Sequence, residues 1–565
     1  MFDVVVSNAR IFDGSGNPWF MGHVGIAGGK ISAIWRSPAG QHAGENIIDA
    51  SGLALCPGVI DVHGHTDFSI LNHPQARNLI SQGITTQGVG QCGFSMYAFS
   101  DEYAPQVKET IEAVTSGAAL DQVDWRTLQQ WRQKVEDTRI ALNLVPYVGH
   151  NTLRCSAMGE EGDRRVDPTR QEMEQMKDLL RQGLEEGAFG LSTGLRYPYG
   201  RNAHTDEVVA LCEVVAQYGG IHISHMRSEE EYLLPSVREL IQISERTGVP
   251  GCATHHKAMF FENWGTPVES LRLLAEARER GADVLCDLYP WTYAREVNLG
   301  TWFGGHLLDG SERDTQDRET LLCTLGDAQD WQNIKERLTK QHHHVQQENQ
   351  RRQEELWKRG VYVPAIWDPA RFDCVMRSPS HPELIGLNFS EVARALQLDD
   401  HWEAMRRLYL EDEGRTLVAA GPISEQDVRR ILSHPLSMVG TDASGTDTTV
   451  DLDDPRAGAH PRGWGTYPKV LGEYVREEKV LSLEEAIRKM TSLPASFLNL
   501  NDRGMIKKGF WADLLLFDPK TIASRATFEE PCEAPSGIRA VFVNGQKVIE
   551  EGEFQNMYPG RVLHR

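Results

Sequence analysis

Long apolar runs are missing from this sequence of 565 residues. None approaches the roughly 20 residues that a helix needs to cross a bilayer. Basic charge is scarce as well, because 58 Lys and Arg residues stand against 80 Asp and Glu residues and the net charge is −22. A nucleic acid or an anionic membrane is therefore not expected as a partner. Any anionic substrate would need cations placed locally at its binding site.

Cysteine is sparse and odd in number, with nine residues that lie mostly in apolar segments. A reduced, cytoplasmic chain without disulfides is the simplest interpretation. The first residues, MFDVVVSNARIFDG, carry an early acid and lack a basic region followed by an apolar core, so no signal peptide is expected. An oligomer is compatible with the sequence, which contains no feature that specifies one.

The stretch from Ala54 to Asp67, ALCPGVIDVHGHTD, contains a short apolar run that predicts a buried strand. Side chains alternate along a strand, so His63 and His65 at its end project to the same side. Two imidazoles directed at one point suit a divalent metal such as zinc. An isolated His-x-His is more often incidental, but here further metal-binding residue types follow at the ends of later strands.

Strand-like and helix-like segments alternate through the middle of the chain, which favours a parallel sheet with crossover helices. Helices are expected at 171–186 and 271–280, each followed by a glycine that ends it. Eight such strands predict an α/β protein of the TIM-like (β/α)8 barrel class, with catalytic groups at the carboxyl ends of the strands. The segments are 57–65, 83–92, 140–150, 188–195, 221–227, 251–257, 282–290 and 436–442.

Short strands with turns occur at both ends of the chain and predict a small β-sandwich domain built from both termini. We assign 1–56 and 496–565 to this domain and 57–495 to the barrel. One connection, 294–435, is abnormally long, and such insertions often serve as lids or subunit contacts. Its polar stretch, 335–360, predicts an exposed helix. The adjacent histidines 342–344 point in different directions around that helix, so they are not expected to bind a metal.

Closure of the barrel would bring several metal-binding residue types to one mouth, a set that fits zinc. Strand parity places His255 on the same face as Lys257, which favours His255 over His256 as a ligand. Cys92, flanked by glycines, is the cysteine best placed to act as a thiolate ligand. Asp442 is the candidate base for a metal-activated water. The expected set is His63, His65, Cys92, His225, Asp442 and one of His255 and His256.

Two cations near these segments could bind a substrate carboxylate in this acidic protein. Lys257 follows the paired histidines, and Arg462 lies in the loop HPRGWGTYP, where its guanidinium could form two parallel hydrogen bonds. Tyr197 in GLSTGLRYP and Tyr289 in DLYP could add hydroxyl donors.

These motifs resemble the amidohydrolase superfamily and, within it, the D-aminoacylase (N-acyl-D-amino-acid deacylase) family. The similarity covers nearly the whole chain outside the long insertion. It rests on the runs GVIDVHGHTD, GITTQGVGQCGFS, GHNTLR, FGLSTGLRYP, ISHMRSE, THHKA, DLYPW, GTDASG, HPRGWGTYPKVLGEYVRE, LSLEEAIRKMTSLPA and GMIKKGFWADLLLFDP.

The resemblance implies zinc-dependent hydrolysis of an N-acyl-D-amino acid to a carboxylate and a free D-amino acid. It also implies a tight zinc site at Cys92, His225 and His255. A second, weaker site would use His63 and His65 and share Cys92 and Asp442 with the first. Asp442 matches the catalytic acid/base of the family, and the residues that match its substrate-binding groups are Lys257, Tyr289, Tyr197 and Arg462.

Three other functions remain open from the sequence: a dipeptidase that releases a D-residue, a cyclic amidase, and a non-catalytic scaffold. Many amidohydrolases carry a modified lysine at the end of the fourth strand, and GLSTGL contains none. Its absence agrees with a bridging Cys92 and counts against a hydantoinase or dihydroorotase.

One departure from the resemblance generates a prediction about the substrate side chain. After DLYPW the chain reads TYARE, where relatives tend to have small residues, so Arg295 could face an acidic side chain. We expect Arg295→Ala to lower turnover of N-acetyl-D-glutamate relative to N-acetyl-D-leucine, measured as the ratio of kcat/KM values. An unchanged ratio would remove Arg295 from the site.

Overall fold

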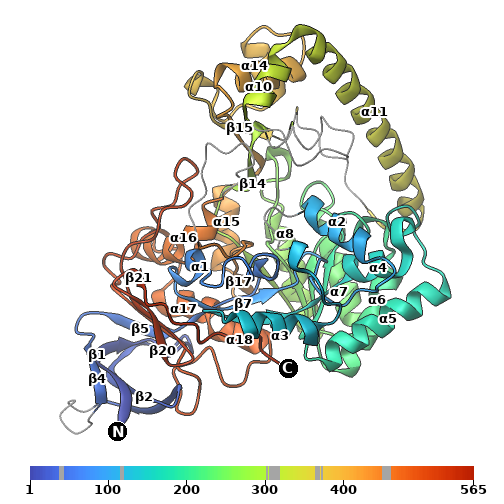
Figure 1. Cartoon of the computed structure of the whole chain (residues 1–565). Coiled ribbons are helices and arrows are strands. Elements are labelled where there is room, and N and C mark those ends of the chain that lie inside the picture. Colours follow the sequence, from blue (N-terminus) through green and yellow to red (C-terminus); the bar gives the residue numbers. More distant parts are fainter. Residues whose placement is uncertain are drawn as a thin grey trace.

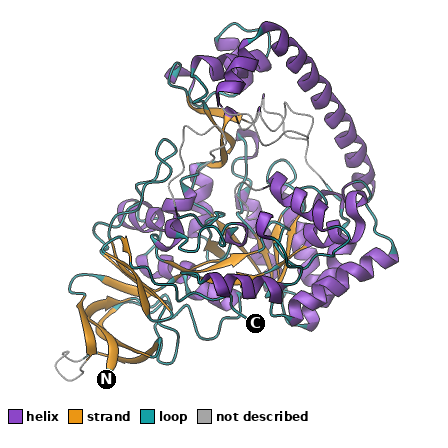
Figure 2. Cartoon of the chain, viewed as in Figure 1, coloured by secondary structure: helices purple, strands orange, loops and turns teal. Residues whose placement is uncertain are grey.

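The structure, a computed structural model, describes residues 1–36, 44–114, 120–300, 303, 318–362, 370, 373–447 and 460–565. A ring of parallel strands lies at its centre, surrounded by helices (Figure 1; Figure 2). These strands are β6 (Val59–Asp61), β7 (Ile84–Val89), β8 (Asn143–Pro146), β9 (Val148–Gly149), β10 (Gly190–Gly194), β11 (Ile221–His225), β12 (Gly251–Ala253), β13 (Val284–Leu288) and β17 (Ser437–Val439).

The ring is made of two hydrogen-bonded sheets, β6-β7-β8 and β9-β10-β11-β12-β13-β17. Only Tyr147 separates β8 from β9, so the two together form one barrel strand. At the opposite junction, a parallel bridge between Gly64 and Ala443 joins β6 to β17. Each of the eight predicted strand segments therefore contains one barrel strand, and the prediction of a (β/α)8 barrel is confirmed.

The buried carboxylate of Asp61 supports the junction between β6 and β17. It accepts hydrogen bonds from Thr441 N at 2.9 Å and from Thr441 Oγ1 at 2.6 Å. Gln87 Nε2 on β7 donates to the same carboxylate at 2.8 Å. Two side-chain-mediated hydrogen bonds from Thr441 thus reinforce the junction of β6 with β17, and the third, from Gln87, ties the same carboxylate to β7.

Helices cover the outside of the barrel, and the two helices expected from the sequence are present. The first, α5, begins with a capping box between Thr169 and Glu172 and is followed by Gly187 at a left-handed φ of 99°. The helices outside the insertion are α1 (Arg77–Ile80), α2 (Ala104–Val114), α3 (Leu128–Thr138), α4 (His150–Met158), α5 (Arg170–Glu185), α6 (Thr205–Gln217), α7 (Leu233–Thr247), α8 (Pro267–Glu279), α15 (Glu425–Ser433), α16 (Arg462–Lys469), α17 (Leu483–Met490) and α18 (Ser492–Phe497). None of the helices in the described residues is long and apolar enough to cross a membrane.

The β domain combines strands from both ends of the chain, as predicted. Its strands form one sheet in the order β21-β20-β19-β18-β5-β1-β2-β3, with β4 paired to β1. The antiparallel pair of β5 and β18 joins the amino-terminal part to the carboxyl-terminal part. The bounds are β1 (Phe2–Ile11), β2 (Phe20–Ala27), β3 (Lys30–Trp35), β4 (Gly44–Asp49), β5 (Ala54–Pro57), β18 (Leu514–Phe517), β19 (Ile538–Val543), β20 (Gln546–Glu550) and β21 (Glu553–Phe554).

Strand β18 is apolar throughout because both of its faces are buried. Leu514 and Leu516 pack into the apolar core of the β domain itself. Leu515 and Phe517 point to the other side and belong to the large apolar cluster of the barrel. Alternation along a single strand therefore fixes the β domain against the barrel.

The long insertion begins at the carboxyl end of β13 and forms a lobe with its own apolar core, which includes Trp331, Phe389 and Leu408. In Figure 1 the helix α11 runs from this lobe back to the barrel, where Arg359 pairs with Asp167 at 2.8 Å. The expected helix over 335–360 is thus confirmed, whereas a lid or interface role stays a prediction. The elements are β14 (Tyr293–Asn298), α10 (Arg318–Gly326), α11 (Ala328–Lys358), β15 (Asp373–Arg377), α13 (Phe389–Ala395), α14 (His401–Glu411) and β16 (Leu417–Pro422).

A buried ion pair between Arg503 and Asp513 generates a prediction about stability. Asp513 also accepts from Asn544 N at 2.6 Å, and Asn544 Nδ2 donates to Asn143 Oδ1 on barrel strand β8 at 2.9 Å. Asp513→Asn leaves the buried Arg503 guanidinium uncompensated, which we expect to lower the free energy of unfolding by about 3–5 kcal/mol. Urea unfolding followed by circular dichroism measures this.

The exposed pair of Arg539 and Glu551 in the same domain provides a matched control. Glu551→Gln should change the free energy of unfolding by less than about 1 kcal/mol, because water screens an exposed pair. Equal effects of Asp513→Asn and Glu551→Gln on the free energy of unfolding would contradict a larger contribution of the buried pair to stability.

Candidate metal centre and substrate-binding site

The metal-type side chains predicted from the sequence meet at the carboxyl ends of the barrel strands, around the sulfur of Cys92. Its Sγ lies 3.4 Å from His63 Nε2 and 3.8 Å from His65 Nε2. On its other side it lies 3.5 Å from His225 Nδ1 and 3.7 Å from His255 Nε2. Two potential ligand groups therefore share one thiol, the first formed by His63, His65, Cys92 and Asp442 and the second by Cys92, His225 and His255.

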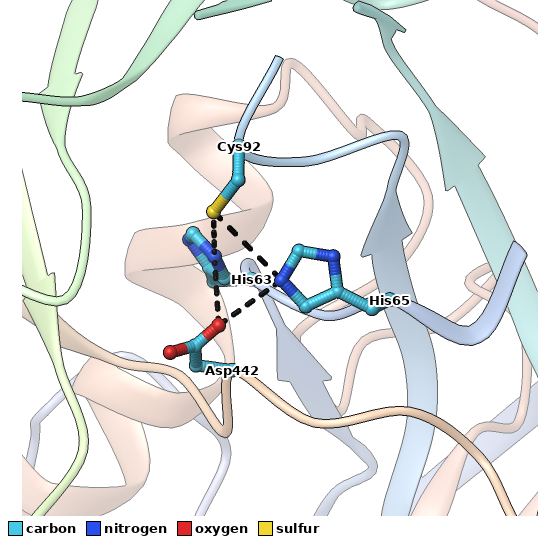
Figure 3. Close-up of side chains that lie close together, drawn as sticks. All are labelled: His63, His65, Cys92 and Asp442. Atoms are coloured by element: carbon cyan, nitrogen blue, oxygen red, sulfur yellow. Dashed lines mark hydrogen bonds and ion pairs between the residues drawn. The ribbon is translucent and has the colours of Figure 1, made fainter. Parts of the chain in front are cut away.

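Figure 3 shows the first of these groups. Asp442 Oδ1 faces both imidazoles, at 3.3 Å from His63 Nε2 and 3.1 Å from His65 Nε2. The two histidines follow β6 and the aspartate follows β17, so the bridge that closes the barrel places them side by side. Asp442 N also donates to His63 O at 2.9 Å, which fixes the backbone of one against the other.

Three residues of the site have a backbone conformation that is rare outside glycine. The φ angles are 53° at Cys92, 36° at His255 and 51° at Asp442. Such left-handed residues cost on the order of 1–3 kcal/mol each and concentrate at functional sites. The chain closely surrounds Cys92, because a Cβ added to Gly194 would lie 1.9 Å from Cys92 O. The fold thus holds these side chains in place against a local conformational preference.

The structure separates the two adjacent histidines that the sequence left open. His255 Nδ1 lies 2.6 Å from Glu229 Oε1, and Nε2 of the same ring faces Cys92. A carboxylate only accepts, so Nδ1 carries the proton and Nε2 keeps its lone pair for a metal. His256 points away, with Nε2 2.7 Å from Ser270 Oγ on α8. The geometry therefore favours His255.

The spacing of the donor atoms fits a tetrahedral zinc ion. Zinc bonds of about 2.3 Å to sulfur and 2.0–2.1 Å to nitrogen or oxygen put tetrahedral ligand atoms about 3.6 Å (S to N) or 3.3 Å (N to O) apart. The observed S-to-N distances are 3.4–3.8 Å and the N-to-O distances 3.1–3.3 Å. Thiolate, imidazole and carboxylate are also the ligand types that zinc prefers.

The charges of the site favour ionised ligands. Burial raises the pKa of the Cys92 thiol, but the neighbouring His63 and His225 outweigh it and hold the pKa well below its ordinary value. Burial likewise raises the pKa of Asp442, and Arg462 with His63 reverses the effect, so that the pKa lies well below its ordinary value. Both shifts favour the deprotonated forms, which metal binding requires.

The predicted substrate-binding residues lie beside this centre. The ring of Tyr289 stands between two cations, 5.3 Å from Lys257 Nζ and 5.0 Å from Arg462 Cζ. Its hydroxyl is buried and has no hydrogen-bond partner among the described residues. Arg462 Nη1 donates to Asp442 Oδ2 at 3.0 Å, and the Tyr197 ring lies 4.5 Å from the His225 ring. The four predicted residues thus lie close to the predicted metal ligands.

Arg295 cannot be placed in the same way. Its backbone belongs to β14, and the preceding Ala294 O accepts a hydrogen bond from Arg462 Nη1 at 2.8 Å. Its side chain lies outside the described residues.

Three residues of the site were not singled out from the sequence: Glu229 and Asp287, which are buried, and His460, which is partly buried. Glu229 contacts His255 and Lys257. Asp287 accepts from His255 N at 2.8 Å and lies 4.0 Å from His63 Nδ1. His460 accepts from Arg462 N at 3.1 Å and lies 3.0 Å from Tyr293 O. An acid inside the apolar strand run VLCDL was a signal for Asp287, whereas Glu229 and His460 lie in polar loops that gave none.

Comparison with known proteins gives three similarities that extend beyond the site. The sequence model of the amidohydrolase family matches residues 46–315 and 369–549 of this chain. An N-acyl-D-aspartate deacylase from Alcaligenes xylosoxydans xylosoxydans is 32% identical over 99% of this chain and 95% of its own, and a D-aminoacylase from the same organism is 31% identical over 100% and 98%. The crystal structure of an N-acyl-D-glutamate deacylase from Bordetella bronchiseptica, complexed with zinc and a phosphonate inhibitor, matches over 100% of both chains with 30% identity and a TM-score of 0.73.

The shared position of Cys92 generates a prediction about metal content. Because both potential ligand groups include this thiol, we expect Cys92→Ala to lose the tightly held zinc that the unaltered protein keeps through gel filtration. Elemental analysis of the purified proteins measures it. Cys212→Ala, which removes an equally buried cysteine from α6, should keep its zinc. A folded Cys92→Ala protein with the same zinc content would contradict the ligand set.

Proposed function

Because this chain belongs to the amidohydrolase family, we propose that it is a zinc-dependent hydrolase that cleaves N-acyl-D-amino acids into a carboxylate and a free D-amino acid. The relatives that are similar over their whole length are deacylases of this kind. The preference for the D-form in this chain rests on that similarity.

The observation that carries the proposal is a pair of cations next to a group of metal-type ligands in an otherwise acidic protein. Lys257 and Arg462 flank Tyr289, and Arg462 also contacts Asp442 of the ligand group. An N-acyl amino acid carries a free carboxylate two bonds from its amide nitrogen. One end of such a molecule therefore fits the cations while its amide faces the metal-type ligands.

Each residue has a defined task in the hydrolysis. Lys257 and Arg462 bind the substrate carboxylate, and the unpartnered hydroxyl of Tyr289 donates a third hydrogen bond to it. Asp442, which is ionised at neutral pH, accepts a proton from the attacking water and returns it to the leaving amino group. Cys92, His225 and His255 would hold the zinc ion, which would supply a Lewis acid able to polarise the amide carbonyl and acidify water.

We place the tight zinc site at Cys92, His225 and His255. The second, weaker site would consist of His63 and His65 together with Cys92 and Asp442. A second ion would have to share the Cys92 thiolate with the first, and repulsion between the two cations would weaken its binding. It would also occupy the Asp442 carboxylate that the proton transfer needs.

The cysteines support a reducing compartment, and we propose the cytoplasm. Seven of the nine are buried. Arg295 remains our candidate for an acidic substrate side chain.

The proposal predicts turnover of one stereochemical series only. Zinc-loaded protein should release free amino acid from N-acetyl-D-glutamate, -aspartate, -leucine or -methionine, and the matching N-acetyl-L-amino acids should react at least about a hundredfold more slowly. A ninhydrin or coupled oxidase assay of the paired substrates measures this.

Two controls separate the alternatives. A cyclic amide such as a substituted hydantoin lacks the free carboxylate, and a dipeptide with a D-residue at its carboxyl end retains it. If zinc is bound and only the dipeptide or the hydantoin is hydrolysed, the deacylase proposal is wrong. Equal rates for D- and L-substrates would overturn the stereochemical part alone.

A further inference from the structure

Glu229 is a buried carboxylate in the loop that follows β11, with 4% of its surface exposed. A single oxygen, Oε1, lies 2.6 Å from His255 Nδ1 and 2.5 Å from Lys257 Nζ. Of the two groups that it contacts, one faces Cys92 in the metal-type cluster and the other faces the Tyr289 ring. No other carboxylate in the described residues pairs with both.

We propose that Glu229 is a positioning residue that sets the orientation of the metal ligand His255 and of the carboxylate-binding Lys257 together. The part that concerns Lys257 rests on the proposed function, because only there is the lysine a substrate ligand. The part that concerns His255 requires only that the cluster binds a metal.

The contact with His255 fixes which nitrogen of its ring is available. An ionised carboxylate cannot donate, so the proton of the neutral ring stays on Nδ1 and the lone pair stays on Nε2. The rotation of the ring is fixed as well, because Nδ1 must face Glu229 while Nε2 faces Cys92. A carboxylate partner also makes the imidazole a stronger electron donor to a metal.

The contact with Lys257 fixes the direction of its ammonium group. Lys257 Nζ donates to Glu229 Oε1 and, at 2.8 Å, to His255 O. Nζ also lies 3.0 Å from His255 Nδ1, but that nitrogen carries the ring proton and cannot accept. One of the three N–H groups of the ammonium therefore remains for a ligand. With two donors held on the protein side, the third is directed without the entropy cost of ordering a free lysine side chain on binding.

Glu229 is itself held by its neighbours. Its N–H donates to Glu230 Oε2 at 3.2 Å, and its carbonyl accepts from Met259 N at 2.8 Å. The second of these bonds ties the loop after β11 to the loop after β12. The carboxylate is therefore fixed relative to the segment that carries both of its partners, which is what a positioning role requires.

Glu207 on α6 offers a matched control in the same molecule. It is also buried, and its carboxylate contacts His150 Nε2 at 2.7 Å and the guanidinium of Arg154. Neither His150 nor Arg154 belongs to the metal-type cluster or to the cations around Tyr289. Glu207→Gln thus repeats the chemical change on a buried carboxylate whose partners are not proposed ligands.

The experiment compares Glu229→Gln, which preserves shape, with Glu207→Gln and the unaltered protein. Circular dichroism first establishes that each protein is folded. Zinc affinity is then measured by competition with a chromophoric chelator, without any substrate. We expect Glu229→Gln to bind zinc about 10–100-fold more weakly and Glu207→Gln to bind it as the unaltered protein does.

Steady-state kinetics on an N-acetyl-D-amino acid at saturating zinc then tests the lysine. Loss of one charge-assisted contact should raise KM about tenfold in Glu229→Gln, with a smaller change in kcat. Glu207→Gln should leave KM unchanged.

The outcomes distinguish the two proposals. Zinc affinity and KM both unchanged in folded Glu229→Gln overturn the inference, as does an equal loss of zinc affinity in Glu207→Gln. If the unaltered protein binds zinc but hydrolyses no N-acyl-D-amino acid, the proposed function fails, and the zinc measurement still decides the inference for His255.

Discussion

The parallel bridge between Gly64 and Ala443 joins the first barrel strand to the last, and the site depends on it. His63 and His65 lie on one side of this junction and Asp442 on the other, although almost the whole barrel separates them in sequence. The buried Asp61 carboxylate stabilises this junction by accepting hydrogen bonds from Thr441 and Gln87. Closure of the barrel and assembly of the ligand group are thus one structural event.

Each of the two cations of the site is compensated by a carboxylate. The protein is acidic overall, yet the buried Lys257 and the partly buried Arg462 lie at the site, and each has a carboxylate partner. A buried cation without such a partner would be strongly destabilising. Glu229 and Asp442 therefore allow the two cations to remain beside a metal-type cluster. Without these carboxylates, the cations and a bound metal ion would repel one another.

Much of this organisation could be predicted from the sequence, because it depends on local patterns. The apolar run before His63 gave a strand, strand parity separated His255 from His256, and glycines after the amphipathic segments marked helix ends. The left-handed conformations of Cys92, His255 and Asp442 could not be predicted, because they oppose the local preference of these residue types. At Cys92 this conformation accompanies close packing against Gly194, which is distant in sequence. Glu229 was missed for a related reason: its partners His255 and Lys257 lie in another loop, and it does not stand out among its polar neighbours in the sequence. His460 contacts Arg462 N in its own loop and the distant Tyr293 O.

The pairing of β5 with β18 has a consequence for biosynthesis. Ribosomes make β5 before the barrel and β18 after it, so the edge of β5 stays unpaired until almost the entire chain has been made. All the metal-type ligands are complete by Asp442, well before the β domain can close. A nascent or truncated chain that ends in between would expose the β5 edge and the apolar surface meant for Leu515 and Phe517, the kind of surface that chaperones recognise and that leads to aggregation. The pairing of β18 with β5 therefore covers a strand edge and an apolar surface that stay exposed until the β domain is complete.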